Sequence, residues 1–146
     1  MKIILASDSH GNTEALKKIA KKHPNADLYL NLGDSESDEF SISPFISVKG
    51  NMDYFSNFRD YVIIPTPYGN LYATHKPPII DDIESLNQSI KIICHGHTHK
   101  RRFEKINNIL YINPGSISYS RDGNDLSYCT IEITKLGINY EFYSLR

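Results

Sequence analysis

Short β-branched apolar runs, each followed at once by glycine, asparagine, aspartate or histidine, divide this chain into regular units. Three such runs occupy the first third, over Lys2–Ser7, Asp27–Leu32 and Phe45–Lys49. Between the first two, Glu14–Lys22 carries apolar residues at helical spacing, and His23-Pro24 ends the predicted helix. This order of strand, loop, helix and strand favours an α/β fold with a parallel β core and helices outside. In such folds the chemistry gathers at the carboxyl ends of the strands.

The second half of the chain predicts antiparallel pairs. We expect one hairpin around Pro65–Asn70, where turn residues separate two β-rich runs, and another around Lys135-Leu136-Gly137. The expected elements are strands over Tyr61–Ile64, Leu71–Thr74, Lys91–Cys94, Arg101–Ile106, Ile109–Asn113, Tyr128–Ile133 and Ile138–Tyr143, and a helix over 80–89. No repeat or low-complexity linker divides the 146 residues, so we expect a single domain over residues 1–146.

Composition excludes several classes of function. Hydrophobic residues make up 40% of the chain and the formal charge is −1, so the chain can bury a core but has no bulk positive charge for nucleic acid. No window approaches the roughly 18 consecutive apolar residues that span a bilayer, and the apolar opening segment is too short for an export signal. The two cysteines are too few for a disulfide framework. We therefore expect a cytoplasmic protein with no membrane partner.

Residues with metal-binding side chains follow most of the predicted strands. They are Asp8, His10, Asp34, Asn51, His75, His97 and His99. Carboxylate, amide and imidazole ligands without thiolate suit a divalent first-row ion such as manganese, iron, cobalt, nickel or zinc. Seven ligands exceed the four of a tetrahedral centre, and they fit two ions that share one carboxylate. The sequence therefore predicts a dinuclear site.

Each segment also has an ordinary structural interpretation. Gly33-Asp34 taken alone is more typical of a turn, and Thr74-His75 alone is more typical of a half-buried imidazole. Asp8-Ser9-His10 alone fits either role. The segment His95–His99 favours metal binding, because three imidazoles in five residues repel one another when protonated. The order of all these segments, each after a strand, favours the metal site.

The segments together resemble the motif set of a known family. They are Asp8-Ser9-His10, Gly33-Asp34, Gly50-Asn51-Met52-Asp53, the lone His75 and Gly96-His97-Thr98-His99. In this order they are similar to the calcineurin-like metallophosphoesterases, and the resemblance covers the chain. Within that family the chain resembles the small single-domain phosphodiesterases of the YfcE type, which share the late segment Asn113-Pro114-Gly115-Ser116.

The resemblance implies a fold and an assignment of ligands. The implied fold is a four-layer αββα sandwich, with two mixed β-sheets flanked by helices on both outer faces. The implied ligands are Asp8, His10 and His99 for one metal and Asn51, His75 and His97 for the other, with Asp34 between them. His95 has no ligand role in this scheme, and we interpret it as a residue that orients the loop.

The chain departs from the family pattern at Met52, where many relatives have a histidine that protonates the leaving group. The small relatives also lack this histidine, so the departure is typical of the subgroup and casts doubt on general-acid catalysis. Lys76 and Arg121 are candidate phosphate contacts, with solvated loop positions as the alternative. We expect Asp53 to orient a ligand imidazole by accepting its free N–H.

The predicted activity is hydrolysis of a small phosphate ester, most simply a phosphodiester, by attack of metal-bound hydroxide. Asp34, Asn51 and His75 would take part through the two divalent ions and by positioning the phosphate. Manganese is favoured, with nickel, iron, cobalt or zinc as alternatives. The competing hypothesis is a protein-interaction scaffold of the same fold with little activity, as in the retromer subunit that has lost ligands. Association into homo-oligomers is left open.

Overall fold

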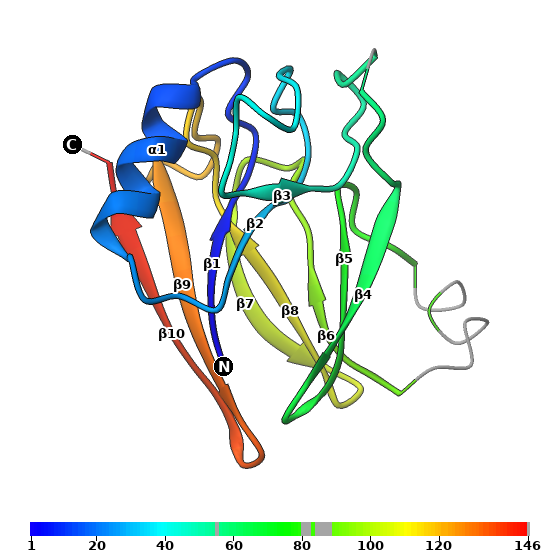
Figure 1. Cartoon of the computed structure of the whole chain (residues 1–146). Coiled ribbons are helices and arrows are strands. Elements are labelled where there is room, and N and C mark those ends of the chain that lie inside the picture. Colours follow the sequence, from blue (N-terminus) through cyan, green and yellow to red (C-terminus); the bar gives the residue numbers. More distant parts are fainter. Residues whose placement is uncertain (55, 80–82, 84–88, 146) are drawn as a thin grey trace.

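The first β-sheet is mixed, with parallel strands at its centre and one edge. The computed structural model describes residues 1–54, 56–79, 83 and 89–145. The sheet consists of β1 (Lys2–Ala6), β2 (Leu28–Asn31), β3 (Ile46–Ser47), β9 (Ser127–Thr134) and β10 (Gly137–Ser144). Their order is β10-β9-β1-β2-β3, in which β1, β2 and β3 are parallel and β9 pairs antiparallel with both β1 and β10 (Figure 1). The predicted terminal hairpin is confirmed.

The second sheet is also mixed, but its three parallel strands lie between two antiparallel edge strands. Its strands are β4 (Tyr61–Thr66), β5 (Gly69–Thr74), β6 (Ile90–Cys94), β7 (Arg101–Ile106) and β8 (Ile109–Pro114). Their order is β4-β5-β6-β8-β7, in which β5, β6 and β8 are parallel. The hairpin expected around Pro65–Asn70 is present as β4 and β5.

The main core lies between the two sheets because each strand points alternate side chains to opposite faces. In β1, Ile3 and Leu5 contribute to the cluster between the sheets, whereas Ile4 contributes to the cluster beneath the helix. Ile92 of β6 also lies in the inner cluster, and Ile93 lies on the outer face of the second sheet. This alternation explains why near-continuous apolar runs are needed in the central strands.

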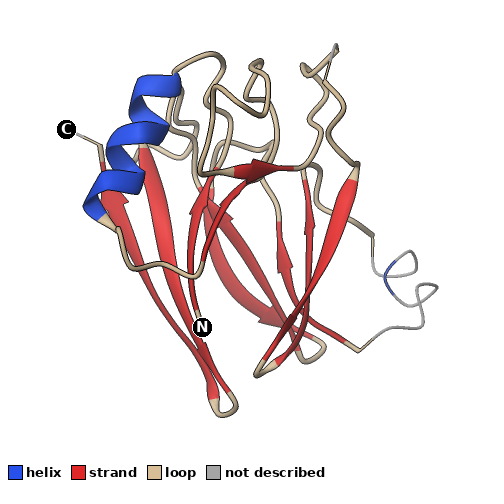
Figure 2. Cartoon of the chain, in the orientation of Figure 1, coloured by secondary structure: helices blue, strands red, loops and turns tan. Residues whose placement is uncertain are grey.

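One helix covers the outer face of the first sheet (Figure 2). Helix α1 (Thr13–Lys22) begins where the Asn12 side chain accepts a hydrogen bond from the Ala15 N–H at 3.2 Å. It buries Leu16 and Ile19 against the sheet. Two mixed sheets with a helical layer confirm the predicted α/β sandwich. The helix expected over 80–89 falls almost wholly outside the described residues.

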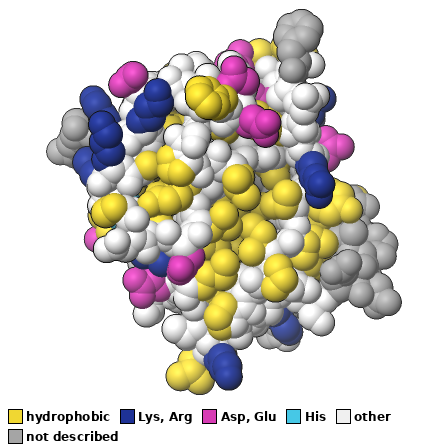
Figure 3. Space-filling model, viewed as in Figure 1, with side chains coloured by type: hydrophobic (Ala, Val, Ile, Leu, Met, Phe, Trp, Pro, Cys, Tyr) yellow, Lys and Arg dark blue, Asp and Glu magenta, His cyan; other side chains and the backbone are white. Residues whose placement is uncertain are grey.

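Apolar side chains gather across the middle of one face of the molecule (Figure 3). No helix among the described residues is long and apolar enough to cross a membrane. Both cysteines, Cys94 and Cys129, are free thiols buried in the inner core.

Candidate metal centre

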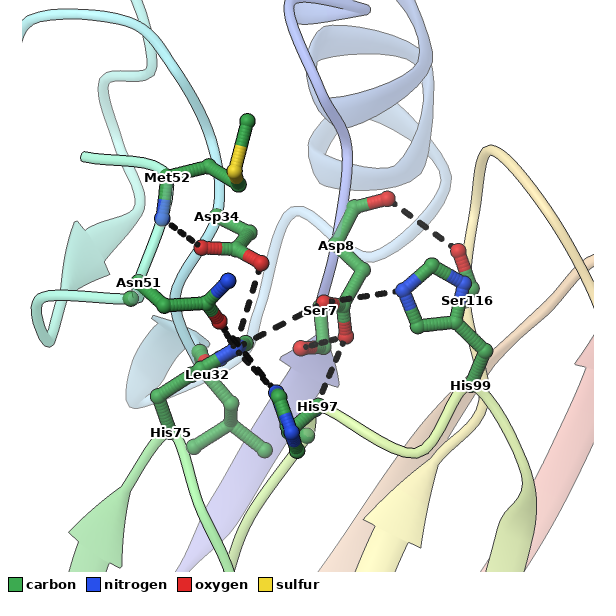
Figure 4. Close-up of polar contacts among 12 residues, drawn as sticks. Ser7, Asp8, Leu32, Asp34, Asn51, Met52, His75, His97, His99 and Ser116 are labelled. Carbon is green, nitrogen blue, oxygen red and sulfur yellow. Dashed lines mark hydrogen bonds and ion pairs between the residues drawn. The ribbon is translucent and has the colours of Figure 1, made fainter.

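The predicted ligands meet at one end of the sandwich, in the loops that follow β1, β2, β3, β5 and β6 (Figures 1 and 4). These five strands are parallel within their own sheets, so their carboxyl ends lie at the same edge. The site therefore lies between the sheets and takes ligands from both. Neither sheet alone would supply the set.

A first cluster contains Asp8, His10 and His99, whose potential ligand atoms lie within 4.8 Å of one another. The distance from Asp8 Oδ1 to His99 Nε2 is 3.3 Å, and that to His10 Nε2 is 4.0 Å. Asp8 and His99 are buried, and His10 is half-buried. This grouping is the same as the first ligand set that the resemblance implies.

A second cluster surrounds His75. Its Nε2 lies 2.9 Å from Asn51 Oδ1, 3.2 Å from His97 Nδ1 and 3.2 Å from Asp34 Oδ2. His97 Nδ1 also lies 3.2 Å from Asn51 Oδ1. Because Asp8 Oδ1 is 3.9 Å from His75 Nε2, the Asp8 carboxylate connects the two clusters. The structure thus brings together all seven residues that the sequence selected.

Backbone carbonyls set the protonation of two imidazoles. His75 Nδ1 lies 2.7 Å from the carbonyl oxygen of Leu32, and His99 Nδ1 lies 2.6 Å from that of Tyr119. A carbonyl can only accept, so the Nδ1 atoms carry the hydrogens and the Nε2 atoms of the neutral rings present lone pairs to the site. Such a partner is typical of metal-ligating histidines.

The acceptor atoms at the centre fit cations. Asp8 Oδ1 is buried and has no hydrogen-bond partner, and His75 Nε2 faces oxygen atoms of Asn51 and Asp34. Lone pairs and carboxylates facing one another at these distances repel unless a positive charge lies between them. Burial raises the pKa of Asp8, but its interactions with the His99 ring and with the Ser7 hydroxyl outweigh burial and hold that pKa below its ordinary value. The carboxylate is therefore available to a divalent ion.

Five of the candidate ligands have a left-handed backbone. The φ values are 56° at Asp8, 45° at His10, 56° at Asp34, 71° at His97 and 60° at His99. Only eight non-glycine residues in the described part of the chain have positive φ, and these five are among them. Side chains other than glycine rarely adopt this conformation, and its concentration at one place indicates a functional constraint.

Two motif glycines have no room for a side chain. A Cβ atom at Gly50 would lie 2.1 Å from Asp34 Oδ1, and one at Gly96 would lie 2.0 Å from Ser7 Oγ. Ser7 in turn donates to Asp8 Oδ2 at 2.6 Å. The glycines that precede Asn51 and His97 thus let a first-sheet loop and a second-sheet loop, respectively, approach the two carboxylates.

The role expected of Asp53 is wrong. Its carboxylate accepts no imidazole N–H; Oδ2 accepts the backbone N–H groups of Asp34 at 2.9 Å and Gly50 at 2.7 Å, and Oδ1 accepts that of Glu36 at 2.9 Å. The carboxylate is buried and accepts these three hydrogen bonds from two loops. Asp53 therefore fixes the loop that carries Asp34, and does not orient a ring.

His95 lies outside both clusters, behind the loop. Its Nδ1 lies 3.0 Å from the Gly96 carbonyl oxygen, and Arg102 donates to its Nε2 at 3.0 Å. Burial lowers the pKa of His95 to about 4, so the ring is neutral at physiological pH. Asn113 donates to the same Gly96 carbonyl at 3.1 Å. Both residues support the backbone between His95 and His97, which agrees with the loop-orienting interpretation.

Sequence reasoning missed three supporting side chains. Glu36 Oε2 lies 2.8 Å from His10 Nδ1, and this contact orients the ring so that His10 Nε2 faces Asp8. The hydroxyl groups of Ser116 and Ser118 donate to the Asp8 carbonyl oxygen at 3.1 and 2.6 Å. The motif Asn-Pro-Gly-Ser contains Ser116, but nothing local in the sequence connects Glu36 to a residue 26 positions earlier.

The three remaining predicted positions lie around the edge of the clusters. The Met52 N–H donates to Asp34 Oδ1 at 2.8 Å, and its side chain points away from the histidines (Figure 4). Lys76 is exposed and its charge acts to lower the pKa of His97, although burial of the His97 ring has the larger effect. Arg121 is exposed, and its backbone N–H donates to the His99 carbonyl at 3.1 Å. Phosphate contacts by Lys76 and Arg121 stay predictions.

Two proteins with similar sequences are named as phosphoesterases. The chain is 31% identical over 153 residues to the probable metallophosphoesterase YsnB of Bacillus subtilis, covering 98% of this chain and 90% of that protein. It is 24% identical over 168 residues to phosphodiesterase YfcE of Escherichia coli, covering 94% and 91% of the two chains.

Similar solved structures share the fold. A predicted phosphoesterase from Streptococcus pneumoniae has a TM-score of 0.84 at 24% identity, covering 98% of this chain and 88% of that one. Vps29 from Chaetomium thermophilum has a TM-score of 0.78 at 16% identity, covering 100% and 89%. The model of the calcineurin-like phosphoesterase superfamily domain matches residues 1–136. With its motif residues gathered at one centre, the chain belongs to the calcineurin-like phosphoesterase superfamily.

Proposed function

We propose that this chain is a dinuclear metal-dependent phosphodiesterase, with the whole site carried by one domain over residues 1–146. The observation that carries the proposal is the buried Asp8 Oδ1 atom, which has no hydrogen-bond partner and faces Nε2 atoms of His75 and His99. A divalent ion on each side of the two central carboxylates would satisfy these atoms. Similarity to phosphodiesterase YfcE supports the choice of diester.

The two clusters support the proposed division of ligands, and the sharing of Asp34 is part of the proposal. The proposed ligands are Asp8, His10 and His99 for one ion, and Asn51, His75 and His97 for the other, with Asp34 shared between them. When bound, such ions lower the pKa of coordinated water and neutralise charge on the phosphoryl group during in-line displacement.

The protein's own groups aim the two carboxylates. Asp8 Oδ2 accepts hydrogen bonds from the Ser7 hydroxyl at 2.6 Å and the His97 N–H at 3.2 Å, so that Oδ1 is directed to the centre. Asp34 Oδ1 accepts from the Met52 N–H, so that Oδ2 is directed to His75. Each carboxylate thus has one oxygen held by the protein and one oxygen free for an ion. Such preorganisation holds the ligands in place before substrate arrives.

The protein-interaction scaffold is the second candidate, and the fold shared with Vps29 supports it. The complete ligand set favours the enzyme, because a scaffold has no need of converging carboxylates with a left-handed backbone. Four further expectations stay predictions. They are manganese as the resident ion, substrate contacts by Lys76 and Arg121, a cytoplasmic location and self-association.

Metal reconstitution tests the proposal. Protein stripped of metal and refilled separately with manganese, nickel, iron, cobalt or zinc is assayed against phosphomonoesters, aryl and alkyl diesters and cyclic nucleotides, with metal content measured in parallel. Asp34→Asn should weaken binding of both ions and abolish diesterase activity, whereas Asp27→Asn, at an exposed position just before the amino end of β2, should do neither. Two ions per chain and near wild-type activity in Asp34→Asn would contradict the shared-carboxylate assignment. Failure of every metal to support hydrolysis would favour the scaffold.

A further inference from the structure

A cavity of about 500 Å³ opens beside the metal centre, between the loops that follow β2 and β3. Its described lining residues are Glu36, Ser37, Asp38, Glu39, Met52, Asp53, Tyr54, Ser56, Asn57 and Phe58. Three of these also contact candidate ligands: Glu36 contacts the His10 ring, the Met52 N–H binds Asp34, and the Asp53 carboxylate accepts the Asp34 N–H. The cavity therefore adjoins the centre, and its volume is enough for the alcohol portion of a small diester.

The charged side chains among the described residues that line the cavity are all acidic. Glu36, Asp38, Glu39 and Asp53 contribute carboxylates, and none of the described lining residues is lysine, arginine or histidine. Asp53 accepts three backbone N–H groups, Glu36 is shared with His10, and Asp38 Oδ1 accepts the Ser41 N–H at 2.7 Å, so among the described carboxylates of the lining the exposed Glu39 is the most available to a ligand. Acidic side chains are also seen along the upper rim of the molecule (Figure 3). A second phosphate or a carboxylate in this cavity would be repelled.

The remaining lining is apolar and aromatic. The Tyr54 ring is 69% exposed, its hydroxyl donates to Met52 Sδ at 3.6 Å, and the half-buried Phe58 lies on the same loop. Aromatic faces together with carboxylates are the usual recognition elements for quaternary and primary ammonium groups. The carboxylates would add nothing to the binding of a purely apolar alcohol group, and they would weaken the binding of an anionic one.

We propose that this cavity binds an alkylammonium group on one ester of the substrate, so that the enzyme prefers diesters of amino alcohols over neutral or anionic diesters. The inference rests on the proposed phosphodiesterase function and adds its substrate class. Glu39 and Tyr54 are the specificity-determining residues in this scheme, Glu39 through its free carboxylate and Tyr54 through the face of its ring.

A pair of isosteric esters tests the inference. One is para-nitrophenyl phosphocholine, and the other is the para-nitrophenyl dimethylbutyl phosphate in which carbon replaces the ammonium nitrogen. Hydrolysis of either ester bond is followed by phosphorus NMR at matched metal occupancy. We expect kcat/KM to favour the cationic ester roughly tenfold. Glu39→Gln and Tyr54→Leu should each reduce this preference about two- to fivefold, and added salt should reduce it too.

The control variant is Glu132→Gln, which removes an exposed carboxylate on β9 and should leave the preference unchanged. Equal cleavage of the two esters by the wild-type enzyme would overturn the inference and leave the phosphodiesterase proposal intact. If neither ester is cleaved with any metal, the phosphodiesterase proposal is rejected. Calorimetry with phosphocholine and dimethylbutyl phosphate then measures separately whether the cavity prefers the ammonium group. Tighter binding of phosphocholine, lost in Glu39→Gln, would support the cavity inference; equal binding would overturn it.

Discussion

Asp53→Asn should destabilise the protein even when no metal is bound. The wild-type carboxylate is 3% exposed and accepts three backbone N–H groups, from Asp34, Gly50 and Glu36. An asparagine has the same shape but only one acceptor oxygen. If that oxygen replaces Oδ2, the amide nitrogen must face the Glu36 N–H, so that two donors oppose each other.

The magnitude follows from these three bonds. A hydrogen bond to a charged group contributes about 1.5–3 kcal/mol and a neutral one about 0.5–1.5 kcal/mol. Weakening two bonds and losing the third should therefore lower the free energy of unfolding by about 3 kcal/mol, after allowance for relaxation of the Glu36 loop. For a domain of this size, that loss lowers the Tm by roughly 6–12 °C.

The assay is thermal and urea unfolding of metal-free Asp53→Asn, followed by metal titration. Asp27→Asn is the matched control, because Asp27 is exposed and accepts one backbone N–H, that of Lys2 at 2.8 Å; it should cost under about 1 kcal/mol. Metal binding by Asp53→Asn should also weaken, since the loop carries Asp34. A metal-free Tm within about 1 °C of wild type would refute the reasoning.

Four further substitutions separate the roles of other residues. His97→Ala should remove metal without lowering the stability of the metal-free protein, whereas His95→Ala should retain metal and lose stability; equal metal loss in the two would contradict the assignment. Met52→His should accelerate alkyl diesters by up to roughly 10²-fold and aryl diesters little, because it adds a general acid; wild-type kcat/KM values independent of leaving-group pKa would count against this. Burial raises the pKa of Asp122, but backbone N–H donors lower it to about 2 from 3.8. The folded-state pKa is thus depressed, so Asp122 should stabilise the fold above pH 3.8 by about 1 kcal/mol after discounting for solvent screening, and this contribution should vanish toward pH 2; an Asp122→Asn difference in unfolding free energy that persists at pH 2 would exclude it.

Local features of the sequence were enough to predict the strands and to select the seven residues that the fold brings together. Alternating burial in β1, where Ile3 and Ile4 face opposite cores, follows from the period of two that any strand imposes. The start of α1 at Asn12 and its end at His23-Pro24 depend on neighbouring residues only. The candidate ligands could be selected because glycine and metal-binding side chains directly follow apolar runs.

Only the tertiary structure decided how those ligands are supported. Asp53 was expected to hold an imidazole, but the folded loops place three backbone donors around it instead. Glu36 meets His10 across 26 residues of sequence, and Ser118 meets the Asp8 carbonyl across 110. The physical reason is that a carboxylate or hydroxyl binds whichever donor or acceptor the packed loops bring within about 3 Å, and strand periodicity carries no information about distances between loops.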